Sequence, residues 1–305
     1  MAVLYDIALA IRQHYDAPVA ASRQTLRLLP PTLAGEQHVV AAAVEVSPQP
    51  AERRDRRDFF GNPAVDVAFG GAHEEITYSL AARVRREAGR EALPNSPLAT
   101  ALAEEAGAIR SLAPGAPHHF LGASPRLPGE PEFADYARAV AAGATGASEV
   151  VEAVGLALHR DMAFDAQATE VDTPALEAFR RRRGVCQDFT HAMIACLRAL
   201  GIPAGYASGF LRTIPPPGRA RLQGADAMHA WVRAWCGRDA GWVEYDPTNA
   251  CLAGDGHVTV ARGRDYSDVA PVRGVLRSAG SQTSRHEVTM TPVGEEDGAT
   301  RPRPD

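Results

Sequence analysis

The chain has 305 residues, of which 45% are hydrophobic. This composition allows one large or two smaller packed domains and excludes a disordered chain. The formal net charge of −5 gives no basic excess, so neither nucleic acid nor a membrane surface is expected as a partner. No apolar run approaches the ~18 residues of a membrane span, and no leader-like segment is seen, so we expect a cytoplasmic protein.

Residues 1–88 are predicted to form a β-sandwich domain. Short apolar or alternating segments, separated by turn residues, recur at a spacing of roughly 10–15 residues. These segments are residues 5–11, 22–29, 38–46, 64–69 and 75–84. The charged stretch at residues 52–58 is interpreted as a solvated loop between strands.

The rest of the chain is predicted to be a connector, a second domain and a tail. Residues 89–130 are rich in Pro, Gly and Ala and contain one helical segment, so we interpret them as the connector. Residues 131–293 alternate helical and strand patterns and predict a mixed domain that ends in further strands. The acidic, then Pro-rich tail at residues 294–305 is predicted to be disordered.

A helix is predicted from Cys186 to Leu200. Its apolar residues recur at helical spacing, and Gly201 with Pro203 marks its end. Cys186 therefore occupies the first turn, where free main-chain N–H groups and the helix dipole favour a thiolate. The thiolate is the nucleophilic form of cysteine.

A β-hairpin is predicted over residues 228–246. Pairing inward from Trp235 opposite Ala240 places His229 directly opposite Asp246 on one face of the sheet. Side chains that face each other in this way have Cβ atoms only ~4.5–5.5 Å apart. A one-residue slip would put the two residues on opposite faces, so the interpretation depends on this register.

Cys186, His229 and Asp246 together predict a thiol acyl-transfer enzyme. The carboxylate would orient the imidazole, and the imidazole would take the thiol proton. The thiolate would attack a carbonyl and form a thioester, which water or an amine resolves. The main-chain N–H of Cys186 is a donor for the oxyanion. Gln187 and Trp231 are candidates for the second oxyanion donor or for the cleft wall.

Other candidates have simpler structural interpretations. His191 lies about 140° around the helix axis from Cys186 and is expected to face elsewhere. Cys196 falls on the apolar stripe of the helix and is interpreted as core. A zinc site formed by Cys236, Cys251 and a histidine lacks ligand spacing, so no metal site is predicted.

The chain resembles the transglutaminase-like superfamily, which is part of the papain-like cysteine enzymes. The resemblance covers about residues 3–293, including an N-terminal part similar to the β-sandwich of bacterial members. The matching motifs are Gly184–Phe189, His229–Val232, Gly241–Val243, Asp246–Asn249 and, less specifically, Leu26–Leu28 and Phe60–Asn62.

This resemblance implies an α+β fold in which a β-sandwich precedes a papain-like core. In that core, a helix that carries the cysteine packs on an antiparallel sheet that carries the histidine and the aspartate. It further implies that Cys186 is the nucleophile, His229 the base and Asp246 the orienting acid, with no cofactor. The expected activity is a protease or amidase acting on a peptide or protein. Two alternatives stay open: a protein-glutamine cross-linking transglutaminase, and a non-catalytic interaction scaffold.

Overall fold

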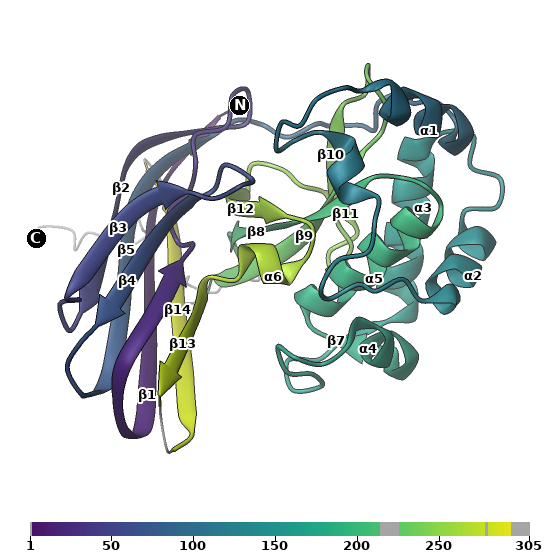
Figure 1. Ribbon diagram of the computed structural model, residues 1–305. Coiled ribbons are helices and arrows are strands. Elements are labelled where there is room, and N and C mark those ends of the chain that lie inside the picture. Colours follow the sequence, from purple (N-terminus) through teal and green to yellow (C-terminus); the bar gives the residue numbers. More distant parts are fainter. Residues whose placement is uncertain (1, 214–225, 278–279, 294–305) are drawn as a thin grey trace, which may run out of the picture.

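The computed structural model describes residues 2–213, 226–277 and 280–293. Figure 1 shows two parts, an all-β part that contains the N-terminus and a part in which helices pack beside a second sheet. The predicted α+β class with an N-terminal sandwich is therefore confirmed. The tail at residues 294–305, predicted to be disordered, lies outside the described residues.

The N-terminal part is a sandwich of two sheets that share the long strand β1 (Val3–Leu26). The first half of β1 pairs with β5 (His73–Arg86) and β14 (Gln282–Pro292), and β2 (Gln37–Ser47) flanks β5. The second half pairs with β4 (Pro63–Phe69) and β13 (Val272–Arg277), and β3 (Glu52–Arg57) flanks β4.

Strand β1 passes from one sheet to the other through an irregular segment. Its pairing register shifts after His14 and again after Ala20, and Ala21 has a positive φ of 54°. Such bulges bend a strand. The sequence predicted two separate strands here, at residues 5–11 and 22–29, because the polar segment between them breaks the apolar alternation.

The interpretation of residues 52–58 as a loop was wrong. Residues 52–57 form β3, which pairs along its whole length with β4. It is the outermost strand of its sheet, and its side chains are almost all exposed. Charged residues are common on such edge strands because they discourage pairing with other molecules. A mixed-charge sequence is therefore compatible with a strand at this position.

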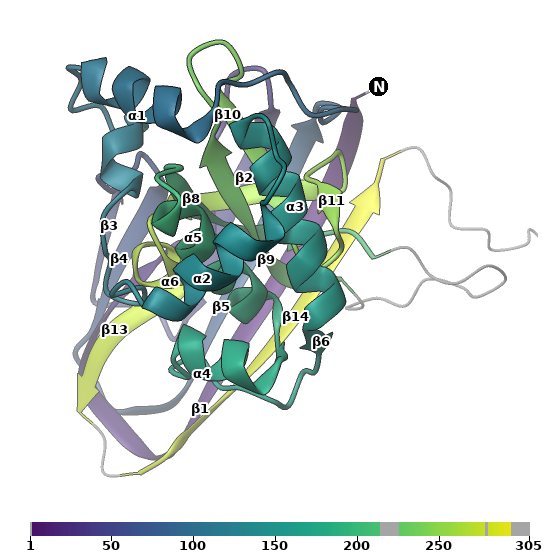
Figure 2. The same ribbon diagram turned by 90° about the vertical axis from the view of Figure 1, so that its right-hand side faces the viewer.

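Within the described residues, the second part contains five longer helices and an antiparallel sheet. The helices are α1 (Ala99–Ala108), α2 (Pro131–Val140), α3 (Ala147–Asp161), α4 (Ala175–Arg181) and α5 (Cys186–Ala199). The sheet has the order β11 (Cys251–Leu252), β10 (Trp242–Asp246), β9 (Ala227–Trp235), β8 (Ala204–Leu211) and β12 (His257–Gly263). Figure 2 shows helices α2, α3 and α5 in front of this sheet. Short elements complete the part: η1 (Pro117–Phe120), β6 (Ala163–Phe164), β7 (Arg183–Gly184) and α6 (Tyr266–Val269).

The chain returns to the sandwich after β12. Residues 131–293 were predicted to form one domain, but the last two strands of this range, β13 and β14, pair with β1. Hydrophobic side chains from both parts also join one buried cluster: Phe210, Val258 and Val260 pack with Ile7, Ile11 and other sandwich residues. The two parts therefore share strands and core.

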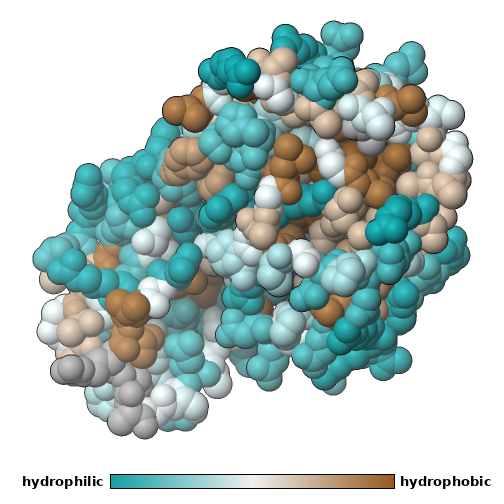
Figure 3. Space-filling model, turned by 45° about the vertical axis from the view of Figure 1, so that its right-hand side comes forward, coloured by the Kyte–Doolittle hydropathy of each residue, from teal (hydrophilic) through white to brown (hydrophobic). Residues whose placement is uncertain are grey.

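The surface of the helical side is mixed in character. In Figure 3, which brings this side forward, hydrophobic side chains gather in patches among hydrophilic ones. Exposed large apolar residues on this part of the chain include Leu112, Leu156 and Phe164. Among the described residues, every helix is too short or too polar to cross a bilayer.

Candidate active site

Cys186 lies at the first position of α5, as the sequence predicted, and it is half-buried. The turn before it is held by Asp188, whose Oδ2 accepts from the Val185 N–H at 2.8 Å and from Thr169 Oγ1 at 2.6 Å. A Cβ on Gly184 would come within 2.4 Å of the same carboxylate oxygen, so glycine allows this close approach. The helix start is thus fixed by local contacts, and the Asp188 carboxylate is directed back along the chain.

The register of the β9–β10 hairpin differs from the predicted one by two residues. Trp242 pairs with Trp235, not Arg233, because the loop spans residues 236–241 and is closed by hydrogen bonds between Cys236, Gly237 and Gly241. The prediction of a shorter loop was therefore wrong. Side chains alternate with a period of two, so a two-residue shift leaves each side chain on its predicted face.

His229 and Asp246 consequently meet as diagonal neighbours on one face of the sheet. The distance from His229 Nε2 to Asp246 Oδ2 is 2.7 Å. His229 is 8% exposed and Asp246 is fully buried. Cys186 lies close enough to His229 to raise the pKa of its imidazole. The structure thus brings together the three residues predicted from the sequence.

Asp246 has further partners that the sequence analysis did not assign. Its Oδ1 accepts from the main-chain N–H groups of Thr248 and Asn249 at 2.9 and 3.2 Å, and its Oδ2 accepts from Asn249 Nδ2 at 2.6 Å. The Asp-Pro-Thr-Asn run is the local signal for this turn, because aspartate side chains commonly accept from N–H groups two residues on.

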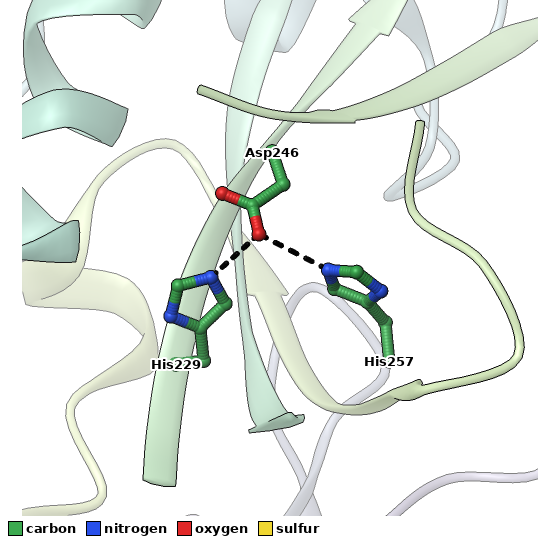
Figure 4. A group of neighbouring side chains, drawn as sticks. All are labelled: His229, Asp246 and His257. Carbon is green, nitrogen blue, oxygen red and sulfur yellow. Dashed lines mark hydrogen bonds and ion pairs between the residues drawn. The ribbon is translucent and has the colours of Figure 1, made fainter. Parts of the chain in front are cut away.

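A second histidine also reaches the Asp246 carboxylate. His257 Nε2 lies 3.2 Å from Asp246 Oδ2, the same oxygen that His229 contacts (Figure 4). The Nδ1 atom of His257 accepts from the Gly254 N–H at 3.2 Å, so the ring proton is on Nε2 and is donated to the carboxylate. The sequence predicted a strand that begins at His257 but carried no local signal for this contact.

These contacts set the electrostatics of the pair. Burial raises the pKa of Asp246, but hydrogen bonds from His229 and His257 outweigh it and hold the pKa well below its usual range. Burial lowers the pKa of His229, yet Asp246 and Cys186 together raise this pKa to about 10. An imidazolium at His229, beside the Cys186 side chain, is therefore favoured at neutral pH.

The two predicted oxyanion candidates differ in their contacts. The Trp231 indole N–H donates to Glu244 Oε2 at 2.8 Å, so Trp231 is already engaged and lies under the site as a packing residue. The Gln187 amide nitrogen donates to the Val171 carbonyl at 3.0 Å. The first N–H groups of α5, including that of Cys186, have no acceptor within the helix.

The competing base and the other cysteines have structural positions. His191 is buried, and its Nε2 accepts from the Tyr266 N–H at 3.2 Å. Burial lowers the pKa of His191 to about 3, so it is a neutral acceptor. Cys196 and Cys236 are buried in the hydrophobic core. Burial raises the pKa of the half-buried Cys251 to about 11, which makes it a poor nucleophile at neutral pH.

The ligand atoms of His229, Asp246 and His257 lie within 4.8 Å of one another, as the ligands of a metal ion do. Ligands of tetrahedral zinc, at ~2.0–2.2 Å from the ion, are about 3.4 Å apart. The His229 and Asp246 atoms are only 2.7 Å apart, and His257 Nε2 carries a proton. The three residues therefore form a hydrogen-bonded network.

Two family profiles match the chain. Residues 134–247 match the Transglutaminase-like superfamily. This range includes Cys186, His229 and Asp246. Residues 5–85 match the Bacterial transglutaminase-like N-terminal region, which corresponds to strands β1 to β5 of the sandwich.

Similar proteins and structures agree with these matches. An uncharacterized protein of Mycobacterium tuberculosis is 35% identical over 250 residues, which cover 79% of this chain and 77% of the relative. The Protein-glutamine gamma-glutamyltransferase of Pseudomonas aeruginosa is 40% identical over 74 residues, or 23% of this chain and 10% of that protein. The crystal structure of a "Putative Cysteine Protease" from Cytophaga hutchinsonii has a TM-score of 0.74 at 21% identity, over 97% of this chain and 92% of the other.

Proposed function

Because the chain belongs to the transglutaminase-like superfamily, we propose that it is a cysteine-dependent amide hydrolase that acts on a peptide or protein through a thioester. The observation that carries this proposal is the buried His229–Asp246 pair beside the half-buried thiol of Cys186. A reactive thiol needs this combination of access and a neighbouring cation.

The proposed reaction has two steps. The Cys186 thiolate attacks the amide carbonyl, and the resulting oxyanion accepts from the Cys186 N–H, with Gln187 as the candidate for the second donor. The His229 imidazolium then gives its proton to the leaving amine, and the thioester remains. In the second step His229 takes a proton from water, the hydroxide attacks the thioester, and the acid product leaves as the thiolate and imidazolium re-form.

Transfer to an amine is the second candidate. An amine in place of water would give a new amide at the same thioester, which is the chemistry of a glutamine cross-linker. The likeness to the Pseudomonas aeruginosa gamma-glutamyltransferase favours this alternative over a scaffold. The chain contains no lysine, so a lysine acceptor would have to belong to another molecule.

The first test compares two half-buried cysteines in one molecule. Iodoacetamide near neutral pH is expected to modify Cys186 at least about tenfold faster than free cysteine, and Cys251 more slowly, because only the thiolate reacts. The His229→Ala variant should abolish the fast reaction. Equal rates for Cys186 and free cysteine, unchanged by His229→Ala, would sink the catalytic proposal.

The second test separates hydrolysis from transfer. The protein is incubated with dimethylated casein and a fluorescent primary amine. Casein cleavage or ammonia release without fluorescence in the casein supports the hydrolase, whereas fluorescent casein supports the transferase. Either activity should be lost in Cys186→Ala and kept in Cys251→Ala.

A further inference from the structure

The five-stranded sheet that carries His229 and Asp246 is called the catalytic sheet below, and side chains of the sandwich cover its outer edge. β12 ends the order of this sheet, next to β8. On its other side, Gln37 Nε2 donates to the Thr259 carbonyl at 2.8 Å, and the Thr259 N–H donates to Gln37 Oε1 at 2.9 Å. The Asn62 side chain pairs with the main chain of Arg262 in the same way. Its Nδ2 donates to the Arg262 carbonyl and its Oδ1 accepts from the Arg262 N–H, both at 2.8 Å. The two amides thus take the place of a neighbouring strand.

Both amides are fixed in the sandwich. Gln37 is 2% and Asn62 3% exposed. The Gln37 amide also donates to the Pro31 carbonyl at 2.8 Å, and the Asn62 amide donates to Asp58 Oδ2 at 3.1 Å. If β12 moved, the two amide oxygens and their main-chain partners would lose these hydrogen bonds while still buried, which is unfavourable. The sandwich therefore dictates where β12 lies.

A charged network strengthens the same connection. The Arg262 guanidinium bonds Glu36 of the sandwich and Glu244 of β10. Glu244 in turn accepts from the Trp231 indole, and the Trp231 ring packs against both His229 and His257, with centroids 6.3 and 5.2 Å away. The network reaches from the sandwich to the underside of the active site.

The first residue of β12 is His257, two positions before Thr259. Its ring is oriented by the Gly254 N–H and donates to Asp246 Oδ2. His257 is 5% exposed, so water does not readily replace it. A displacement of β12 would therefore move this donor away from the carboxylate.

We propose that Gln37 and Asn62 of the sandwich are positioning residues of the active site, and that they act through β12 and His257 to keep Asp246 directed at His229. The inference rests on the proposed function. It makes the sandwich a part of the site and not a separate module.

The test follows the proton on His229 in the full chain. Histidine is labelled with ¹³C, and the His229 ring signal, identified by its absence in His229→Gln, is titrated. In the unsubstituted protein its midpoint is expected at about 10. A carboxylate that is no longer aligned holds the imidazolium less well, so Gln37→Ala, Asn62→Ala and His257→Ala should each lower the midpoint by about one unit.

Two comparisons separate positioning from loss of stability. His257→Gln retains a side-chain N–H donor and should restore most of the midpoint lost in His257→Ala. Val67→Ala removes a buried sandwich side chain, 3% exposed, from β4 and should leave the midpoint unchanged. All variants are compared below their unfolding transitions, and if one of them does not fold, the other amide variant and the His257 pair decide.

The iodoacetamide rate of Cys186 distinguishes the two possible failures. A slow reaction in the unsubstituted protein contradicts the proposed function itself. A fast reaction that Gln37→Ala and Asn62→Ala leave unchanged, together with an unchanged His229 midpoint, overturns the positioning role. A higher midpoint in these variants also overturns it, because His257 would then weaken the carboxylate as an acceptor and not align it.

Discussion

At the scale of single residues, the site depends on one carboxylate that is surrounded by donors. Asp246 is fully buried and accepts from the side chains of His229, His257 and Asn249. A buried charge is tolerated only where it is well hydrogen-bonded, and these donors supply that condition. The same bonds leave the carboxylate ionised, so it can stabilise a positive charge on His229.

The Asp246→Asn substitution should therefore lower the pKa of His229 from about 10 towards its ordinary value of 6.5. His229 would then be largely neutral at slightly alkaline pH, and the thiolate of Cys186 would lose its counter-charge. Iodoacetamide modification near neutral pH is expected to slow at least about tenfold. Asp6→Asn, which removes an exposed acid paired with Arg83, is the control and should have no effect. An unchanged rate in Asp246→Asn would show that the carboxylate does not set the proton affinity.

At the scale of elements, the sequence predicts faces better than registers. The face shared by His229 and Asp246 follows from the period of two along each strand, and it survived a two-residue error in the loop. The loop itself depends on Gly237 and Gly241, both with positive φ, and the sequence pattern did not distinguish their turn from a tighter one. The helix that begins at Cys186 was predictable, because its signals are local.

Helix α3 approaches β10 closely at Gly155. A Cβ at this position would lie 2.2 Å from Cε1 of Tyr245, the residue before Asp246, and Tyr245 is only 2% exposed. Gly155→Ala should therefore lower the free energy of unfolding by about 1–3 kcal/mol, since the buried ring has little room to move. Urea denaturation measures this value.

The matched control is Gly107→Ala in α1, where an added Cβ meets nothing within 4 Å. This change should leave the protein as stable or make it more stable by up to ~1 kcal/mol, because alanine is the better helix former. Equal effects of the two substitutions would mean that the α3–β10 contact is looser than the structure shows.

At the scale of the whole molecule, the two parts are joined by a common hydrophobic cluster and by strand pairing. Phe210, Val258 and Val260 of the catalytic sheet lie in the hydrophobic cluster of the sandwich. Strands β13 and β14 come after Cys186, His229 and Asp246 in the chain but pair with β1. We therefore expect the sandwich and the catalytic part to unfold together.

A substitution in the sandwich can test this expectation through the tryptophans. The chain has three tryptophans, Trp231, Trp235 and Trp242, and all lie in the catalytic sheet. Ile11→Ala, at a fully buried position in β1, should reduce stability by roughly 2–5 kcal/mol. The unfolding transition seen by tryptophan fluorescence should move to lower denaturant by the same amount as the transition seen by circular dichroism. A fluorescence transition that stays in place would show that the two parts unfold independently.

The sequence by itself determined the β-rich character of the N-terminal part, the helix start at Cys186 and the shared face of His229 and Asp246. Each follows from contacts between near neighbours or from the periodicity of a single element, which the order of residues expresses directly. The tertiary structure alone decided that His257 joins Asp246, that Gln37 and Asn62 hold β12, and that the last strands return to β1. The Gln37–Thr259 contact joins residues 222 positions apart. Such pairs arise only when packing brings distant strands together, and no local pattern records them.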